Sequence, residues 1–141
     1  MEAGLMMTRV KANELKSLAL AYMGDAVYEK YVREHLIEQG KVKVQELHSL
    51  AITYVKADAQ ANVLKEWLAQ EKLTTEETQI AKRGRNAKSG STPKSTTVQT
   101  YRYSTAFEAL IGFLYLDGQI DRLEELIQLA IEKVEEGVEM E

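Results

Sequence analysis

An aspartate lies inside an apolar segment that has the spacing of a buried helix. The segment places Asp25 among apolar side chains at helical intervals: Leu18, Tyr22, Met23, Val27, Tyr28 and Tyr31. This spacing predicts one broad buried face. Because burying an unpaired carboxylate costs several kcal/mol, such an aspartate normally has a cation, a metal ion or strong hydrogen-bond donors beside it. The alternative is a kinked core helix whose Asp25 is solvated.

Gly24 directly precedes this aspartate. A glycine inside a helix costs about 1 kcal/mol of stability relative to alanine. Because glycine has no side chain, the position suits close approach by another backbone or by a ligand. The pair Gly24-Asp25 therefore predicts a crowded site that carries a negative charge.

Two segments and the loop between them resemble the ribonuclease III family. Residues 23–29, Met-Gly-Asp-Ala-Val-Tyr-Glu, are similar to the signature helix of that family. Residues 107–117, Phe-Glu-Ala-Leu-Ile-Gly-Phe-Leu-Tyr-Leu-Asp, are similar to its second acidic helix, and residues 83–90 resemble its Gly/Lys/Ser loop. The blocks follow the family's order and separation, and the resemblance covers residues 13–136. The lack of room for a double-stranded-RNA-binding domain indicates the short bacterial branch called Mini-ribonuclease III.

The resemblance implies that Asp25 and Glu108 are catalytic and hold Mg²⁺. Each lies in an apolar helix, where a shared Mg²⁺ would relieve the cost of a bare carboxylate. Hydrolysis of a phosphodiester needs a nucleophilic water and neutralisation of the charge that grows on the phosphate oxygens, and a bound magnesium ion supplies both. Taken alone, Glu108 could instead lie on the exposed face of an amphipathic helix.

The chain departs from full-length members of that family near both carboxylates. Those enzymes carry four clustered carboxylates, and two of them fall where this chain has Ala21 and Thr105. The sequence therefore leaves open one or two metal ions, and water or Thr105 would fill part of the coordination. Glu29 follows Asp25 by one turn and could orient a metal-bound water or lie beside Arg33; a supporting or structural role is favoured.

Other catalytic chemistries find little support in the sequence. His35 and His48 are explained as surface or half-buried histidines, and no Ser-His-Asp order, HExxH motif or P-loop is present. The chain has no cysteine, so a disulfide framework and a thiolate metal site are excluded, and a reducing cytoplasm is the simplest expected location. With no run of 18 apolar residues and no signal-peptide pattern, we expect no membrane contact.

The charges are segregated along the chain. The formal net charge is -4, yet residues 78–107 hold several Lys and Arg residues and no acidic residue, while acidic residues dominate after position 117. This pattern indicates a basic, phosphate-facing surface and a solvated acidic one, with a chance cluster on a solvated face as the alternative.

The loop 84–100 and the residues just before it are the predicted contact with double-stranded RNA. Duplex RNA is recognised largely by shape, phosphates and 2'-hydroxyls. A plain flexible loop is the alternative, and Tyr101 and Tyr103 are expected to pack under the loop rather than stack on sugars. The candidate RNA-binding residues are Lys82, Arg83, Arg85, Asn86, Lys88, Ser89 and Lys94.

The expected fold is all-α with one domain. Residues 13–136 are predicted to form it, between tails at 1–12 and 137–141. A β-branched cluster at 52–55 has no strand partner nearby, so helix is favoured there. The expected helices are 14–37 with a break near Ser17 and an end at Gly40, 43–52, 55–70, a helix begun by a capping box at Thr74 that ends near 84, 105–116 capped by Ser104 and ended at Gly118, and a last one from Asp121.

Cleavage of both strands of a duplex needs two sites, which a two-fold homodimer provides. Tyr22, Met23 and Val27 are the candidate interface residues. The resemblance implies a magnesium-dependent endonuclease that matures the 23S ribosomal RNA precursor and leaves 5'-phosphate and 3'-hydroxyl ends, with a large-subunit ribosomal protein as a further candidate partner. The alternatives are a non-catalytic RNA-binding or ribosome-assembly module with the same fold, and a helical scaffold without an RNA partner.

Overall fold

The computed structural model describes residues 11–88 and 90–139, and over these ranges it contains helices and no strand. The all-α prediction is therefore confirmed. None of the described helices combines the length and apolar character that crossing a lipid bilayer requires. The elements are a short 3-10 helix, η1 (Ala12–Glu14), followed by α2 (Ser17–Glu38), α3 (Val44–Val55), α4 (Ala57–Ala69), α5 (Thr75–Asn86), α6 (Val98–Leu116) and α7 (Ile120–Glu139).

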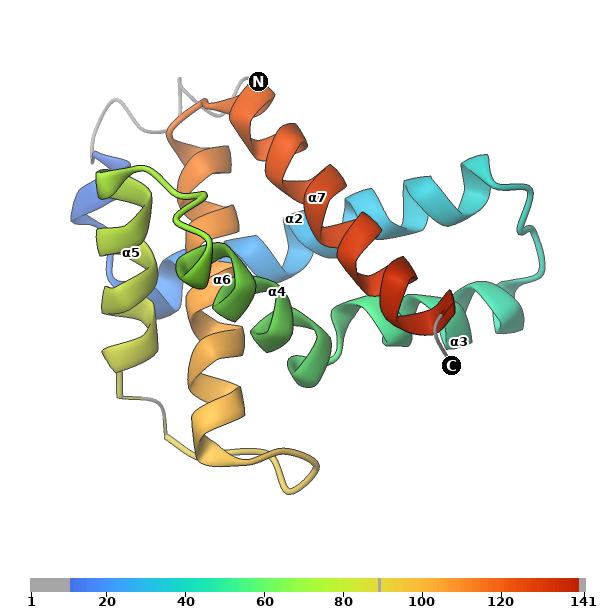
Figure 1. Cartoon of the computed structure of the whole chain (residues 1–141), viewed down its shortest axis with the longest axis horizontal. Coiled ribbons are helices and arrows are strands. Elements are labelled where there is room, and N and C mark those ends of the chain that lie inside the picture. The colour runs from blue at the N-terminus through green and yellow to red at the C-terminus, as the bar shows by residue number, and fades with distance from the viewer. Residues whose placement is uncertain (1–10, 89, 140–141) are drawn as a thin grey trace.

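Helix α6 is the centre of the domain. In Figure 1 it stands upright, with α2 crossing behind it and α5 on its left. Helix α7 starts beside the upper end of α6 and runs diagonally toward the lower right. Nearly every side chain from Ser104 to Leu116 is buried. A helix that is apolar on all sides can be stable in water only when neighbours cover it, which explains the central place of α6.

Three aromatic side chains join α2, α4 and α6 at the middle of the core. The ring of Tyr28 meets that of Phe107 edge to face at 4.9 Å between centroids, and the ring of Trp67 lies 5.7 Å from Phe107 on another side. All three are almost fully buried. Large buried aromatic rings contribute strongly to core stability, so this cluster fixes α6 between its two neighbours.

Several predicted helix ends are confirmed. The chain breaks before Ser17, where η1 ends and α2 begins. The capping box at Thr74 forms as expected, because its hydroxyl accepts from the backbone of Glu77 while the Glu77 side chain accepts from the backbone of Thr74. Gly40 and Gly118 adopt positive φ angles of 91° and 77° just after α2 and α6. These ends could be predicted because each depends on local chemistry alone.

Other predicted boundaries were wrong. Helix α6 begins at Val98, capped by Thr97, and Ser104 lies inside it instead of capping it. The break between α3 and α4 falls at Lys56, whose ψ is 153°, and not at residues 52–53. Helix α7 extends to Glu139, past the predicted domain end. Ala12, assigned to a tail, is buried in the core.

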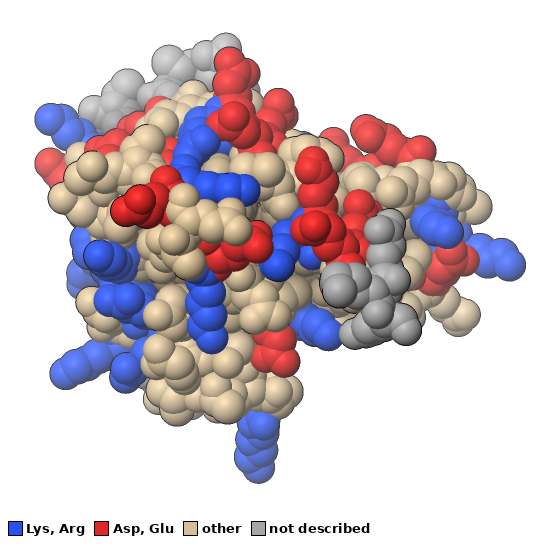
Figure 2. All heavy atoms as spheres, viewed as in Figure 1, with Lys and Arg blue, Asp and Glu red and all other residues tan. Residues whose placement is uncertain are grey.

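The charge segregation predicted from the sequence is visible on the surface. Figure 2 shows lysine and arginine side chains gathered mainly over α5 and the loop that leads into α6, and acidic side chains gathered along α7. A surface divided in this way presents one face suited to phosphates.

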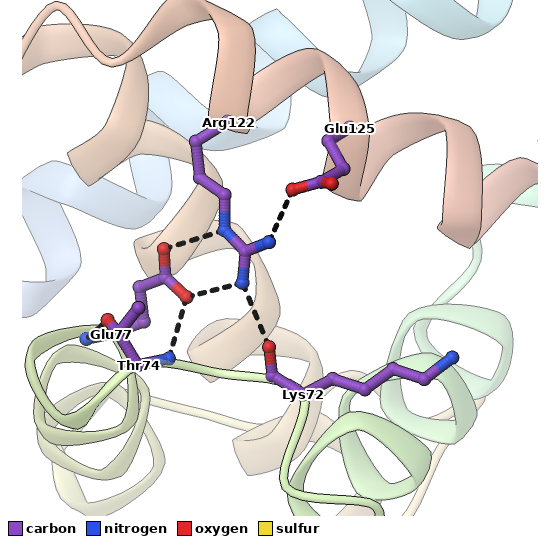
Figure 3. A network of polar contacts seen from close by, with 5 residues as sticks. All are labelled: Lys72, Thr74, Glu77, Arg122 and Glu125. Carbon is purple, nitrogen blue, oxygen red and sulfur yellow. Dashed lines mark hydrogen bonds and ion pairs between the residues drawn. The ribbon is translucent and has the colours of Figure 1, made fainter.

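A buried ion pair ties α7 to the start of α5. The Arg122 guanidinium donates to both carboxylate oxygens of Glu77 at 2.9 and 2.8 Å and to the backbone oxygen of Lys72 at 2.9 Å (Figure 3). Burial alone would raise the pKa of Glu77, whose side chain is 4% exposed, but hydrogen bonds from Arg122 and from Thr74 outweigh it and lower that pKa. The network therefore stabilises the fold most when Glu77 is ionised.

A second polar cluster explains His35. Its Nε2 lies 2.8 Å from the Glu135 carboxylate, which also accepts a hydrogen bond from the Tyr54 hydroxyl at 2.8 Å. Burial would raise the pKa of Glu135, but these two hydrogen-bond partners lower it overall. His35 thus joins α2 to α7, and His48 is exposed, so both placements agree with the ordinary roles expected for the histidines.

Candidate active site

Helices α2 and α6 touch backbone to backbone at two glycines. A Cβ atom built on Gly24 would collide with the backbone oxygen of Glu108 and lie 2.9 Å from the nitrogen of Gly112. A Cβ atom on Gly112 would collide with the backbone oxygen of Leu20 and lie 2.9 Å from the nitrogen of Gly24. Only glycine fits at these two positions, so the close backbone approach suggested by Gly24 is confirmed.

This crossing brings Asp25 and Glu108 together from positions far apart in the sequence. Asp25 follows Gly24 directly, and Glu108 supplies the backbone oxygen that contacts Gly24. Asp25 is exposed and Glu108 is half-buried, so the pair lies where solvent and ligands can reach it. Burial raises the pKa of Glu108 to about 8, and the neighbouring Asp25 carboxyl adds to this through its charge and through hydrogen bonding.

The amide of Gln60 is a third polar group at this pair, and it was not among the residues predicted from the sequence. Gln60 lies in α4 and is 2% exposed, and its amide opposes the other effects by lowering the pKa of Glu108. One signal could have found it: Gln60 falls one turn before Val63 and Leu64, on the buried face of α4, where an apolar residue is expected.

Three positions near the two carboxylates, at which supporting roles or missing ligands were predicted, agree with the predictions in part. Thr105 is buried, and its hydroxyl donates to the backbone oxygen of Tyr101 at 3.0 Å, so its donor capacity is already used. Glu29 forms an ion pair with Arg33 at 2.8 Å, the structural role considered for it. Ala21 is buried and brings no ligand. Among the described residues no group of three or more His, Cys, Asp or Glu side chains could hold a metal ion.

The donor set fits Mg²⁺ nevertheless. Magnesium is commonly held by one or two carboxylates and completes its coordination with waters and substrate phosphates. Asp25 and Glu108 provide two carboxylates, and the raised pKa of Glu108 shows that negative charge is poorly compensated there in the protein alone. A divalent cation between the two would remove this penalty.

The predicted RNA-binding residues have different surroundings. Lys82, Asn86, Lys88 and Lys94 are exposed. Arg85 is half-buried and lies 5.9 Å from the ring centre of Tyr103, and Tyr103 itself packs against the core.

Arg83 has a structural role that the sequence did not reveal. Its guanidinium donates to the backbone oxygens of Asn13 and Leu15 at 2.9 and 2.8 Å and so anchors η1. Ser89 lies outside the described residues. The exposed lysines, more than Arg83, therefore form the basic surface of this region.

The candidate interface residues lie at different depths in α2. Tyr22 is 83% exposed, Met23 is half-buried, and Val27 is 6% exposed. Val27 belongs to the core of the protomer itself, so it offers little surface to a partner. Tyr22, one turn from Asp25, is the side chain that a second copy could cover.

Comparisons with known proteins agree on one family. The profile of the Ribonuclease III domain matches residues 18–119. The chain is 51% identical over 123 residues to Mini-ribonuclease 3 of Enterococcus faecalis, covering 87% of this chain and 93% of the relative. It is 44% identical to Mini-ribonuclease 3 of Streptococcus pneumoniae over 126 residues, covering 89% of this chain and 98% of the relative.

A solved structure is similar as well. The crystal structure of a protein from Fusobacterium nucleatum superposes with a TM-score of 0.75 at 30% sequence identity, covering 84% of this chain and 93% of the other. The helical arrangement around α2 and α6 is therefore shared with a chain of known structure.

Proposed function

The chain belongs to the ribonuclease III family, and from this premise we propose that it is a magnesium-dependent endoribonuclease that cuts both strands of double-stranded RNA as a homodimer. The observation that carries the proposal is the backbone crossing of α2 and α6, which brings Asp25 and Glu108 to one accessible place.

Asp25 and Glu108 would hold the ion. When bound, Mg²⁺ supplies a nucleophilic water at neutral pH and neutralises charge that develops on the phosphate oxygens. The exposure of Asp25 leaves room for water and for a phosphate of the RNA, whereas the partial burial of Glu108 restricts how its carboxylate can turn. The rigid helix crossing keeps both carboxylates in place, which is the protein's main contribution to such a site.

The basic surface would position the duplex. Exposed Lys82 lies in α5, and exposed Lys88 and Lys94 lie in the loop before α6, where they can contact phosphates without reading base edges. Phosphate contacts fix the register of a nucleic acid on a protein and carry no sequence information directly. The bound duplex would then lie with one strand at the carboxylate pair.

A second copy would provide the site for the other strand. The exposed Leu18 and Tyr22 lie one turn apart on the same side of α2, close in sequence to Asp25. A two-fold dimer that covers this apolar surface would bring two carboxylate pairs near one another. Met23, half-buried beneath, would support the same interface.

The proposed substrate is the double-stranded stem of the 23S ribosomal RNA precursor in the cytoplasm. The resemblance to the short bacterial branch supports it, as does a basic surface suited to duplex shape. The expected products carry 5'-phosphate and 3'-hydroxyl ends. A large-subunit ribosomal protein bound to the precursor is a further candidate partner.

The test is cleavage of a duplex RNA by an Asp25→Asn variant. The variant should dimerise and bind the duplex like the unmodified protein, while cleavage in Mg²⁺ is lost. Undiminished cleavage by the variant would contradict the proposal. Mass spectrometry of products from a precursor stem checks the ends and the substrate.

The competing function, a non-catalytic RNA-binding or ribosome-assembly module, would draw its support from the missing acids at Ala21 and Thr105. It makes a different prediction for the same assay: RNA binding that survives chelation of divalent metal, and no new RNA ends. The convergence of the remaining two carboxylates favours the enzyme, because a module that only binds RNA has no use for a half-buried acidic side chain beside a second one.

A further inference from the structure

Gln60 has a buried amide with one unpaired end. Its Oε1 accepts a hydrogen bond from the Ser104 hydroxyl at 2.7 Å, but its Nε2 makes no hydrogen bond with the described residues. A buried donor without a partner costs about 1 to 3 kcal/mol, so native cores rarely leave one unless it has another use.

The Gln60 amide interacts with Glu108, one of the two carboxylates. Ser104 and Glu108 are four residues apart in α6 and therefore lie one above the other on the same side of that helix. Because Ser104 already uses the oxygen of the Gln60 amide, only its nitrogen is left to interact with Glu108, one turn further along α6. The effect of Gln60 on Glu108 agrees with this, since the amide favours the charged carboxylate.

We propose that Gln60 is a positioning residue of the active site: held by Ser104, its Nε2, which has no partner among the described residues, would donate to the Glu108 carboxylate once that carboxylate and Asp25 hold a divalent ion. The inference rests on the proposed metal site. A Glu108 carboxylate without this partner could rotate away from the ion, and hydrogen-bond partners that orient metal ligands typically contribute roughly 10- to 100-fold in metal affinity.

The test is Mn²⁺ binding to the full chain, measured by titration calorimetry without RNA. Gln60→Leu replaces the amide by an apolar side chain of similar size. The new side chain suits its surroundings, because Val63 and Leu64 beside it are buried. We expect this variant to bind Mn²⁺ roughly tenfold more weakly, while its urea unfolding in chelator is unchanged or shifted to higher urea. Ser104→Ala removes the hydroxyl that donates to the Gln60 amide. It should weaken Mn²⁺ binding too, but by less than Gln60→Leu does.

Two control variants separate the possible outcomes. Glu77→Gln disturbs a buried network in another part of the fold, so it should lower stability and leave Mn²⁺ affinity unchanged. Unchanged Mn²⁺ affinity in both Gln60→Leu and Ser104→Ala would overturn the positioning role, as would an equal loss in Glu77→Gln. If Glu108→Gln binds Mn²⁺ as tightly as the unmodified protein, the metal site itself fails. A loss in Glu108→Gln without one in Gln60→Leu refutes the role of Gln60 alone.

Discussion

Replacing Gly112 by alanine tests the helix crossing on which the site depends. The added Cβ would overlap the backbone oxygen of Leu20 and lie 2.9 Å from the nitrogen of Gly24. Both are backbone atoms of α2, so neither can rotate away as a flexible side chain would. Helices α2 and α6 would have to separate by roughly 1 Å to restore ordinary contact.

The expected magnitude is the balance of two effects. Overpacking a core costs about 1 to 3 kcal/mol, and a backbone obstacle places this variant at the upper end. Alanine in place of glycine inside a helix stabilises the helix by up to about 1 kcal/mol, which offsets part of this loss. We therefore expect Gly112→Ala to lower the free energy of unfolding by about 2 kcal/mol.

Gly137→Ala is the matched control. Gly137 also lies in a helix, but a Cβ there would meet no atom within 4 Å. This control should raise stability by about 0.5 to 1 kcal/mol, so the two variants should differ by about 3 kcal/mol in urea unfolding at equal protein concentration.

Gly112→Ala should also weaken Mn²⁺ binding, because separating α2 from α6 separates Asp25 from Glu108. Gly137→Ala should leave Mn²⁺ binding unchanged. If Gly112→Ala is as stable as Gly137→Ala and binds Mn²⁺ like the unmodified protein, the backbone crossing does not hold the site together.

Three further predictions follow from the charges. The folded-state pKa of Glu108, about 8, lies above its ordinary value of 4.5, so this group's contribution to stability is lost as pH rises from about 4.5 to 8. In chelator at pH 8, Glu108→Gln should therefore have a free energy of unfolding about 2 kcal/mol higher than the unmodified protein, after allowance for solvent screening. At pH 5 the difference in urea unfolding should be much smaller. Glu77 has a lowered pKa, so its contribution to stability is present above about pH 4.5 and lost as pH falls below it. Glu77→Gln should lower the free energy of unfolding by about 2 kcal/mol at pH 7, and the difference from the unmodified protein should disappear in acid. A difference that is independent of pH would be inconsistent with the ion pair. Lys82→Ala should reduce by about 1 the slope of log affinity for duplex RNA against log salt, whereas Lys133→Ala, on the acidic face and paired with Glu66, should leave the slope unchanged in filter-binding titrations.

The sequence was most informative where a feature depends on neighbouring residues. The capping box at Thr74 and the turn at Gly118 need only local chemistry, and both were predicted. The close approach at Gly24 was predicted too, because a glycine inside an apolar helix lacks the side chain that would keep another backbone at a distance. The partner of Gly24, however, is 88 residues away at Gly112, and only the folded chain reveals that the two meet.

Features that depend on distant partners were missed. The residues from Val98 to Ser104 lack apolar periodicity, so the first turns of α6 were assigned to the loop and Ser104 to a cap. In the structure Ser104 is a buried partner of Gln60, 44 residues earlier in the chain. Arg83 was assigned to RNA for its charge, but two backbone oxygens of the N-terminal segment occupy its guanidinium. Charge and polarity indicate that a side chain needs a partner without identifying which one.

The most direct test of the central claim is the position of a bound ion. Crystals of the full chain grown with Mn²⁺ can be measured at a wavelength where manganese scatters anomalously. We predict an anomalous peak at the crossing of α2 and α6, bonded to a carboxylate oxygen of Asp25 and one of Glu108. A peak bonded to only one of these carboxylates, or peaks confined to other parts of the surface, would contradict the account.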